Sequence, residues 1–219
     1  IELDKRAGEL SAFSLTMKAR EREKKFFKHA VQPNICVLEN IKFENGEINE
    51  YMNEMGLNIF TNNFKETLKQ FHESDNLGSL IQPLLDNDNE IFNTIENKNL
   101  SSNIFLNSTH NRVIKVLNQS AYLKNKYHIV IANPPYMGSN GMNLRLSEFA
   151  KNYYPDSKAD LFAMFMERAL KMNLKNGIMA MVNMQSRMFL STYEKLRLKI
   201  LSNSTLLNMA HIGTRGFDT

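Results

Sequence analysis

Four consecutive residues have the types and spacing to do chemistry: Asn133, Pro134, Pro135 and Tyr136, which directly follow the apolar run YHIVIA. A single Asn-Pro pair is an ordinary turn signal, because the residue before a proline is pushed into an extended conformation. Two successive prolines have a further consequence, since neither has a backbone N–H and both have a fixed φ. Together with the side-chain oxygen of Asn133, they predict a rigid cluster of hydrogen-bond acceptors.

Such a cluster matches an exocyclic amino group on an aromatic base, which carries two N–H donors. Tyr136 offers a ring on which the base can stack, an interaction of about 1–3 kcal/mol per base. The amino nitrogen is a poor nucleophile while its lone pair is delocalised into the ring. Two acceptors can draw it toward sp3 geometry, so that it attacks an electrophilic methyl group while the acceptors stabilise the developing positive charge. The alternative is a plain strand-terminating turn.

Alternating strands and helices are expected to position this segment. Two predicted helices begin after the N-cap residues Asp4 and Asp160. A third begins after Ser191, which is predicted to form a capping box with Glu194. The predicted strands are residues 1–3, 34–43, 127–132, 177–184 and 205–213. The strands at 127–132 and 177–184 are predicted to be buried. This order predicts an α/β fold with a doubly wound, mostly parallel sheet, in which ligands bind at the carboxyl ends of strands.

Residues 46–126 differ in character from the rest of the chain. They are rich in asparagine, lysine and glutamate, and long stretches of them have helical periodicity. We therefore predict a mainly helical insertion, which divides the chain into residues 1–45, 46–126 and 127–219.

Composition excludes several classes of protein. The chain has 219 residues, a net charge of +4 and one cysteine, Cys36, which excludes an internal disulfide and predicts a small buried hydrophobe. The five histidines have no ligand spacing, so we expect no metal. No apolar run reaches the roughly 18–20 residues that cross a bilayer, and no signal-peptide pattern is present, so we expect no membrane partner and a cytoplasmic location.

The segment NPPY after an apolar strand resembles the catalytic motif of N6-adenine-specific DNA methyltransferases, which use S-adenosylmethionine. The longer stretches YPDSKADLFAMFMERAL, MQSRMFLSTYEKLR and NMAHIGTRGFD resemble the large methyltransferases of BREX phage-resistance systems, the PglX type. The resemblance covers residues 1–43 and 120–219 well and the insertion weakly. It implies a Rossmann-like methyltransferase fold, incomplete here, with residues 1–45 from the cofactor-binding half and 127–219 as the catalytic half.

The resemblance also implies roles for individual residues. Asn133 and the Pro134 carbonyl would bind the target amino group, Pro135 would stiffen the turn, and Tyr136 would stack on a flipped adenine of double-stranded DNA. Three further residues would bind the cofactor. Glu2 would bind its ribose hydroxyls, Leu3 would contact its adenine ring, and Glu39 would bind the amino group of that ring. For the two glutamates, a solvated strand end is the alternative.

Residues around the motif are candidates for contacts with DNA. The segment 137–149 could cover a flipped base, and Gln185 and Ser186 could line the site. Three basic side chains could reach phosphates, although ordinary solvation is the alternative for each: Arg145, Lys151 and Lys158. Asp160 could line the pocket, but a helix cap is the favoured role.

The cofactor-binding glycine loop of the family is absent from this sequence and would lie just before Ile1. The part that would recognise the DNA sequence is absent too, so we expect an internal fragment that is inactive on its own. Two alternatives stay open. One is methylation of a protein glutamine or a ribosomal RNA base, and the other is a non-catalytic DNA-binding or assembly subunit that works with other defence proteins.

Overall fold

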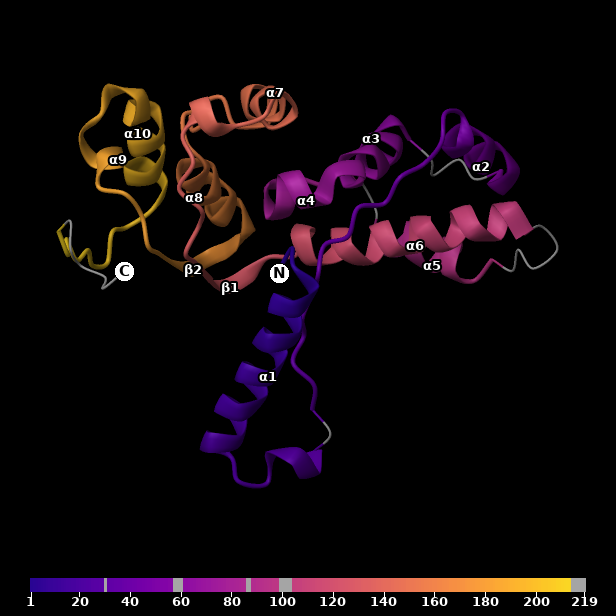
Figure 1. Cartoon of the computed structure of the whole chain (residues 1–219), viewed down its shortest axis with the longest axis horizontal. Coiled ribbons are helices and arrows are strands. Elements are labelled where there is room, and N and C mark those ends of the chain that lie inside the picture. Colours follow the sequence, from indigo (N-terminus) through magenta and orange to yellow (C-terminus); the bar gives the residue numbers. More distant parts are fainter. Residues whose placement is uncertain (30, 57–60, 86–87, 99–103, 214–219) are drawn as a thin grey trace. The chain divides into compact units, whose positions relative to one another are not determined.

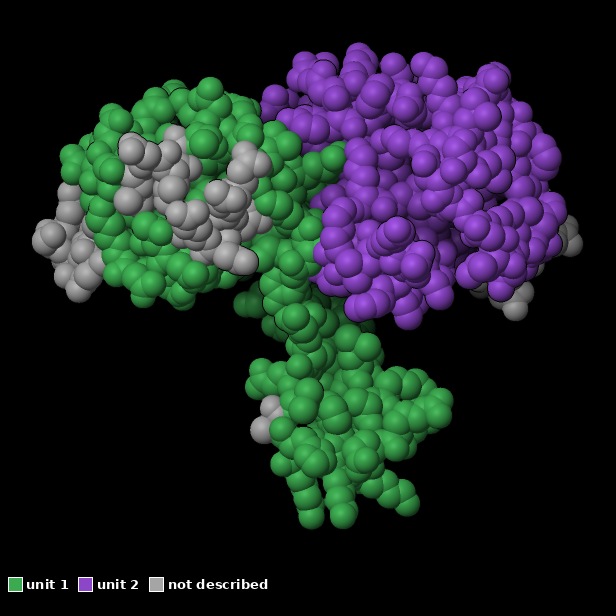
Figure 2. Space-filling model, turned by 180° about the vertical axis from the view of Figure 1, so that it is seen from behind, with its two compact units in different colours: residues 1–125 green, residues 126–219 purple. Residues whose placement is uncertain are grey.

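The computed structural model describes residues 1–29, 31–56, 61–85, 88–98 and 104–213 (Figure 1). Contacts divide the chain into two compact units, residues 1–125 and residues 126–219 (Figure 2). Each unit is described by itself below. The three-part division by role that the sequence suggested stays a prediction.

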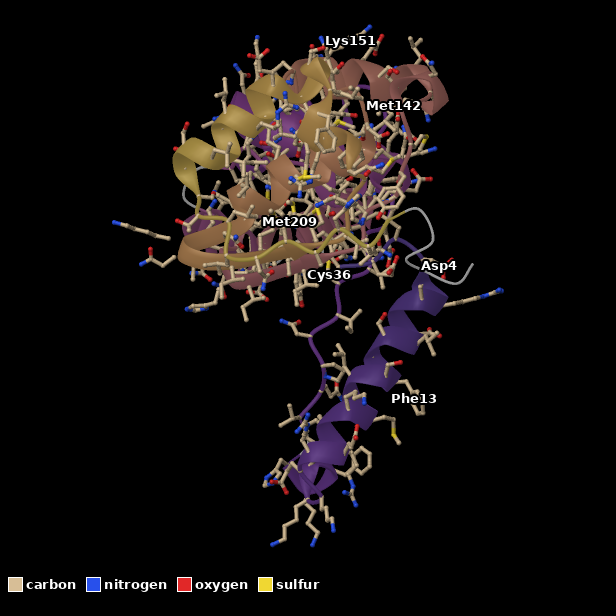
Figure 3. The ribbon with its side chains drawn as sticks, turned by 90° about the vertical axis from the view of Figure 1, so that its left-hand side faces the viewer. Asp4, Phe13, Cys36, Met142, Lys151 and Met209 are labelled. Atoms are coloured by element: carbon tan, nitrogen blue, oxygen red, sulfur yellow. The ribbon has the colours of Figure 1, made fainter. Side chains whose placement is uncertain are left out.

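Unit 1 begins with helix α1 (Lys5–Arg22), whose predicted N-cap is confirmed: the Asp4 carboxylate accepts the N–H of Ala7. Gly8 is the buried residue of this helix. It lies so close to Val37 that a Cβ at this position would be 2.6 Å from a methyl group of Val37. The apolar side chains of α1 are mostly uncovered. Figure 3 shows the ring of Phe13 projecting from the helix, and Leu10 and Met17 are exposed as well.

The two strands predicted at the start of the chain are wrong in extent. Glu2 and Val37 form a single isolated parallel bridge, held by the hydrogen bonds Glu2 N to Cys36 O and Leu38 N to Glu2 O. After this bridge the backbone pairing stops, and the N–H of Glu39 donates to the Gln119 side chain instead. The thiol of Cys36 is buried, as predicted.

The rest of unit 1 is helical, in the region where a helical segment was predicted. Amphipathic stretches end at sharp turns, for example where α2 stops at Gly56 in the left-handed region and α3 starts at its N-cap, Thr61. The helices are α2 (Glu47–Met55), α3 (Asn62–Gln70), α4 (Ser74–Leu77), α5 (Asp88–Glu96) and α6 (Ile104–Lys124). Short 3-10 turns are Phe26–His29, Phe71–Glu73 and Gly78–Leu80. Phe64, Leu68 and Val113 are fully buried in this unit.

Unit 2 is built on two parallel strands, β1 (Tyr127–Ala132) and β2 (Asn173–Met181). The crossover between them contains α7 (Leu144–Tyr153) and α8 (Leu161–Met172). After β2 come α9 (Ser186–Phe189), a 3-10 turn (Ser191–Tyr193) and α10 (Glu194–Asn203). The mixed α/β class is confirmed, with this two-stranded sheet in the described part of the chain.

The two strands differ from the buried strands that were predicted. Paired residues of a parallel sheet share a face, and Ile129 pairs with Ile178 while Ile131 pairs with Ala180. On that face Ile129 is 58% and Ile131 is 75% exposed. Helix α8 packs against β1 and β2, and the side chains of Met179 and Met181 join its core, so only one face is covered.

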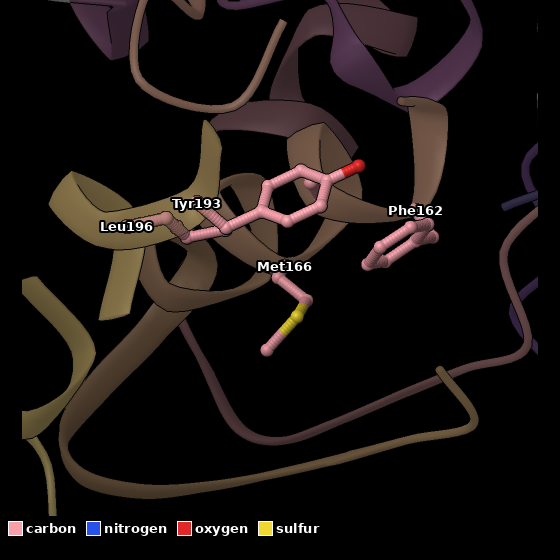
Figure 4. Close-up of a cluster of buried hydrophobic side chains, with 5 residues drawn as sticks. Phe162, Met166, Tyr193 and Leu196 are labelled. Carbon is pink, nitrogen blue, oxygen red and sulfur yellow. The ribbon is translucent and has the colours of Figure 1, made fainter. Parts of the chain in front are cut away.

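A small apolar cluster joins α8 to the turn and helix that follow β2 (Figure 4). Its members are Phe162, Ala163, Met166, Tyr193 and Leu196, all buried. The rings of Phe162 and Tyr193 lie 5.6 Å apart between centroids. Truncating a buried phenylalanine typically costs about 3–5 kcal/mol, so this cluster fixes the end of α8 that faces the motif.

Two predictions for the end of the chain are wrong. Residues 205–213 form no strand in the structure, because no neighbouring strand pairs with them, and Leu206, Leu207 and Met209 are exposed. The capping box at Ser191 does not form either: α10 begins at Glu194, and its N-cap is Tyr193, without a side-chain cap. A 3-10 turn takes Ser191 instead, because Tyr193 packs into the apolar cluster. In the described residues, no helix is both long and apolar enough to cross a membrane.

Candidate active site

The motif lies where β1 ends. The N–H of Val182 donates to the Ala132 carbonyl at 3.2 Å, which extends the pairing of the two strands by one step beyond β2. Because parallel strands end at a common edge, the segments after Ala132 and after Val182 start side by side. Asn133 and Tyr136 are both exposed there, while Pro134 is buried.

The corner formed by Asn133 and the prolines was predicted to present hydrogen-bond acceptors. In the described part of the chain, no group donates a hydrogen bond to the carbonyl of Pro134. The side-chain oxygen of Asn133 accepts a long hydrogen bond of 3.3 Å from the hydroxyl of Tyr136. This contact is weak by the distance usual for O–H···O bonds, near 2.7–2.8 Å, so the oxygen can exchange it for a better donor.

Tyr136 combines an accessible ring with a firm support. The residue is 48% exposed, and its ring meets the ring of Phe162 edge-on, with centroids 6.2 Å apart and planes at 78°. Phe162 belongs to the buried cluster of α8. The tyrosine ring therefore contacts a buried aromatic neighbour, and nearly half of the residue's surface is accessible to a second flat group.

Asp160 ties the segment after the motif to α8. Its Oδ1 accepts the N–H of Met137 at 3.1 Å and the N–H of Phe162 at 3.2 Å, so that one oxygen holds the loop and caps the helix. Around it, Gly138 and Asp160 form an antiparallel bridge, and Leu161 N donates to the carbonyl of Met137 at 3.0 Å. The predicted cap is confirmed, and the bond to Met137 adds a second function to the same carboxylate.

A buried carboxylate on α8 stabilises the turn that precedes this helix. Glu167 on α8 is 3% exposed and accepts hydrogen bonds from Ser157 Oγ (2.8 Å) and Lys199 Nζ (2.9 Å). Burial alone would raise the pKa of Glu167, but these hydrogen bonds and the charges of Lys199 and Lys171 outweigh it and lower the pKa below 4.5. The network fixes Ser157, which begins the turn that ends at Asp160.

The predicted covering loop is shorter than expected. Asn143 caps α7 by accepting the N–H of Leu146 at 2.9 Å, so residues from 144 onward are helical. Only 137–143 remain as a connection, and this includes a 3-10 turn (Ser139–Gly141). Gln185 contacts His211 Nε2 at 2.6 Å through its side-chain oxygen, and Ser186 begins α9.

The three predicted cofactor contacts lie together in unit 1. Leu3 and Glu39 follow the Glu2–Val37 bridge in parallel segments, so both leave it at the same end. One carboxylate oxygen of Glu2 accepts the N–H of Leu3 at 2.8 Å, and the carboxylate of Glu39 pairs with Lys115 at 3.0 Å. The side chain of Leu3 is partly exposed. Asn133 to Tyr136 belong to unit 2.

Comparison with known proteins decides the family. A family model described as Eco57I restriction-modification methylase matches residues 1–217. The chain belongs to this family.

Two relatives of this Eco57I-family chain carry more specific names. "Adenine-specific methyltransferase BrxX" from Escherichia coli O9:H4 (strain HS) is 36% identical over 241 residues, which cover 99% of this chain and 20% of that protein. "Adenine-specific methyltransferase PglX" from Lacticaseibacillus casei (strain Zhang) is 33% identical over 224 residues, with 100% and 18% covered. The chain thus spans about a fifth of the length of these relatives. The predicted resemblance to PglX-type methyltransferases is confirmed.

Sequence reasoning missed two features of this Eco57I-family site. The bond from Met137 to Asp160 connects residues 23 positions apart, and no local pattern announces it. The other is Asn183, whose side-chain oxygen is buried without a hydrogen-bond partner in the described residues. Since Ala132 pairs with Met181, the register continues to place Asn183 opposite Pro134. A polar Asn near the carboxyl end of the apolar run 177–184 was the available signal.

Proposed function

We propose that this chain is part of an adenine-specific DNA methyltransferase that transfers a methyl group from S-adenosylmethionine to the exocyclic N6 amino group of adenine. The observation that carries the proposal is the acceptor-only corner at the end of a parallel strand, where the Asn133 side chain is exposed and the Pro134 carbonyl receives no hydrogen bond from the described residues. The family match and the names of the two relatives support it. A role in BREX-type phage defence, with other defence proteins and in the cytoplasm, belongs to the same proposal.

The corner's chemistry suits the adenine amino group. Its two N–H bonds would donate to the Asn133 side-chain oxygen and to the Pro134 carbonyl, neither of which requires a change of protonation. The hydroxyl of Tyr136, now 3.3 Å from that oxygen, would give way to a stronger donor. Both acceptors then face the nitrogen as it gains positive charge, which is stabilisation by preorganised dipoles. The surplus proton of the nitrogen leaves to solvent afterwards.

The exposed ring of Tyr136 would stack on the adenine. Reaching the amino group requires extrusion of the base from the duplex, which costs a few kcal/mol. Stacking contributes about 1–3 kcal/mol per base, so it offsets a large part of this cost. The T-shaped contact with Phe162 keeps the tyrosine ring in place, and 48% of the residue's surface is accessible.

The residues of unit 1 fit the cofactor chemically. S-adenosylmethionine supplies an electrophilic methyl group when bound. Glu2 keeps one carboxylate oxygen without a partner in the described residues, and a carboxylate is a suitable acceptor for ribose hydroxyls. The exposed side chain of Leu3 offers an apolar surface for an adenine ring, and Glu39 offers an acceptor for an amino group.

We also propose that the two strands of unit 2 are part of a larger doubly wound, Rossmann-like sheet. Parallel sheets occur almost always with both faces covered, whereas Ile129 and Ile131 are exposed here. This chain alone would bind the cofactor weakly and lack activity. Calorimetric titration with S-adenosylmethionine is expected to give no binding in the micromolar range, and micromolar binding would contradict this part of the proposal.

The test uses the whole enzyme that contains this segment, with labelled S-adenosylmethionine. Label is expected in N6-methyladenine of duplex DNA, and the Asn133→Ala variant should lose it while keeping cofactor binding. Protein extract and ribosomal RNA are supplied in parallel reactions. Label in either of those instead of DNA, or DNA methylation that persists in Asn133→Ala, would overturn the proposed function.

A further inference from the structure

A cleft of about 310 Å³ lies beside the segment that follows the motif. Its walls come from three places: the 3-10 turn after the motif, helix α7 with the turn after it, and the turn before α10. Polar groups on these walls are Ser139, Ser147, Lys151, Asp156, Lys158 and Thr192. Figure 3 labels Lys151, at the end of α7.

The two lysines of the cleft are available for a ligand. Several other basic side chains of unit 2 are engaged: Arg145 pairs with Glu148 at 3.7 Å, and Lys171 and Lys199 pair with Glu167. Lys151 and Lys158, by contrast, have no ion-pair or hydrogen-bond partner among the residues that the structure describes. Both side chains are exposed. In the sequence, Lys151 precedes and Lys158 follows residues 155–156, which line the cleft as well.

The cleft is fixed relative to the motif. Ser139 stands three residues after Tyr136, and its N–H donates to the carbonyl of Ala159 at 2.9 Å. Three extended residues span at most about 11 Å. A DNA strand advances about 3.4 Å per nucleotide along the helix axis, so the cleft lies within about three nucleotides of a base that stacks on Tyr136.

We propose that this cleft binds a backbone phosphate of the DNA strand that carries the target adenine, a few nucleotides or less from the extruded base. The inference rests on the proposed function and adds a strand-holding site to it. Lysine ammonium groups and serine or threonine hydroxyls are common donors to DNA phosphates, and such contacts set register rather than sequence preference. Ser139, Ser147 and Thr192 supply the hydroxyls.

Asp156 makes the proposal sharper, because its carboxylate lines the same cleft and opposes a phosphate. Loss of the two lysines and loss of Asp156 should therefore change DNA affinity in opposite directions. A folding defect can weaken binding, but it cannot strengthen it. Asp156→Asn thus serves as a variant whose expected gain a folding defect cannot explain.

The experiment measures binding of the whole enzyme to duplex DNA at several salt concentrations. The parent is compared with the double variant Lys151→Ala/Lys158→Ala, with Asp156→Asn, and with Lys175→Ala as control. Lys175 is an exposed lysine in the amino-terminal half of β2, at the end of the strand away from the motif. A plot of log K, with K the DNA-binding constant, against log salt concentration has a negative slope. Each lost phosphate contact should make this slope less steep by about 0.9, which corresponds to about eightfold weaker binding at 0.1 M salt.

We expect that loss for the double variant, tighter binding for Asp156→Asn and no change for Lys175→Ala. An unchanged slope in the double variant of an enzyme that methylates DNA would overturn the cleft assignment alone. If the parent does not methylate DNA, the proposed function fails, and the cleft assignment fails with it.

Discussion

Removing the carboxylate of Asp160 is predicted to disturb the active corner without unfolding the protein. Asp160→Ala deletes the acceptor of two backbone donors, Met137 N–H and Phe162 N–H. Each such bond contributes about 0.5–1.5 kcal/mol net, so the free energy of unfolding should fall by about 1–3 kcal/mol. Native domains are stable by about 5–15 kcal/mol, and the variant therefore stays folded.

The effect on catalysis should exceed the effect on stability. Without its bond to Asp160, the Met137 backbone can drift, and with it the corner that begins at Asn133. A misplacement of about 1 Å in a reacting group can cost about 100-fold in rate. We expect kcat of the whole enzyme to fall by about that factor, measured in single turnovers with labelled S-adenosylmethionine, while duplex DNA is bound almost normally.

The control is Asp160→Asn, which keeps an acceptor oxygen in the same place. Asparagine and aspartate are nearly equal as N-caps, so stability and kcat should stay close to those of the parent. Full kcat in Asp160→Ala would refute the idea that this residue positions the motif. Equal losses in both variants would show that the negative charge matters rather than the acceptor, and would also refute it.

Three further predictions concern other parts of unit 2. Tyr136→Phe keeps the stacking ring and should retain kcat/KM for DNA within about fivefold, whereas Tyr136→Ala loses stacking of about 1–3 kcal/mol and should lose about 5- to 150-fold. The pKa of Glu167 is lowered, so its contribution to stability is complete above pH 4.5 and is lost as pH falls through the lowered value. Glu167→Gln should therefore flatten the acid loss of stability in denaturant melts from about pH 6 to about pH 3, and an unchanged profile would contradict the network. Gly177→Ala places a Cβ 3.0–3.1 Å from three backbone carbonyl oxygens and should cost about 1–3 kcal/mol in the same melts; Gly138→Ala, with 3.7 Å to its nearest neighbour, is the control.

Local patterns predicted the elements that depend on local physics. The apolar run YHIVIA became β1 with the expected bounds, because a β-branched run before a proline has few other options. The caps Asp4 and Asp160 also follow from short-range hydrogen bonding. Residues 205–213 have an equally apolar pattern but form no strand, since a strand requires a partner and periodicity does not supply one.

The residue types of the proposed site could be read from the sequence, but the contacts that support them could not. Asn133 and Tyr136 were recognisable because their chemistry is contained in four consecutive letters. The contact of Tyr136 with Phe162 depends on how α8 packs after a crossover. Lys151 and Lys158 were each ordinary candidates in the sequence, and only the turn between them brings them to one cleft.

The same prolines that make the corner chemically useful also make it hard to hold in place. Pro134 and Pro135 have no backbone N–H to donate, so the protein cannot anchor them by their own donors. The structure supplies the anchor just after the motif: Met137 and Ser139 both donate to the turn before α8, and Leu161 donates back to Met137. The corner proposed to offer acceptors to the adenine therefore takes its rigidity from the segment that follows it. This is why Asp160→Ala, which removes no hydrogen bond of the four motif residues, should still lower kcat by about 100-fold.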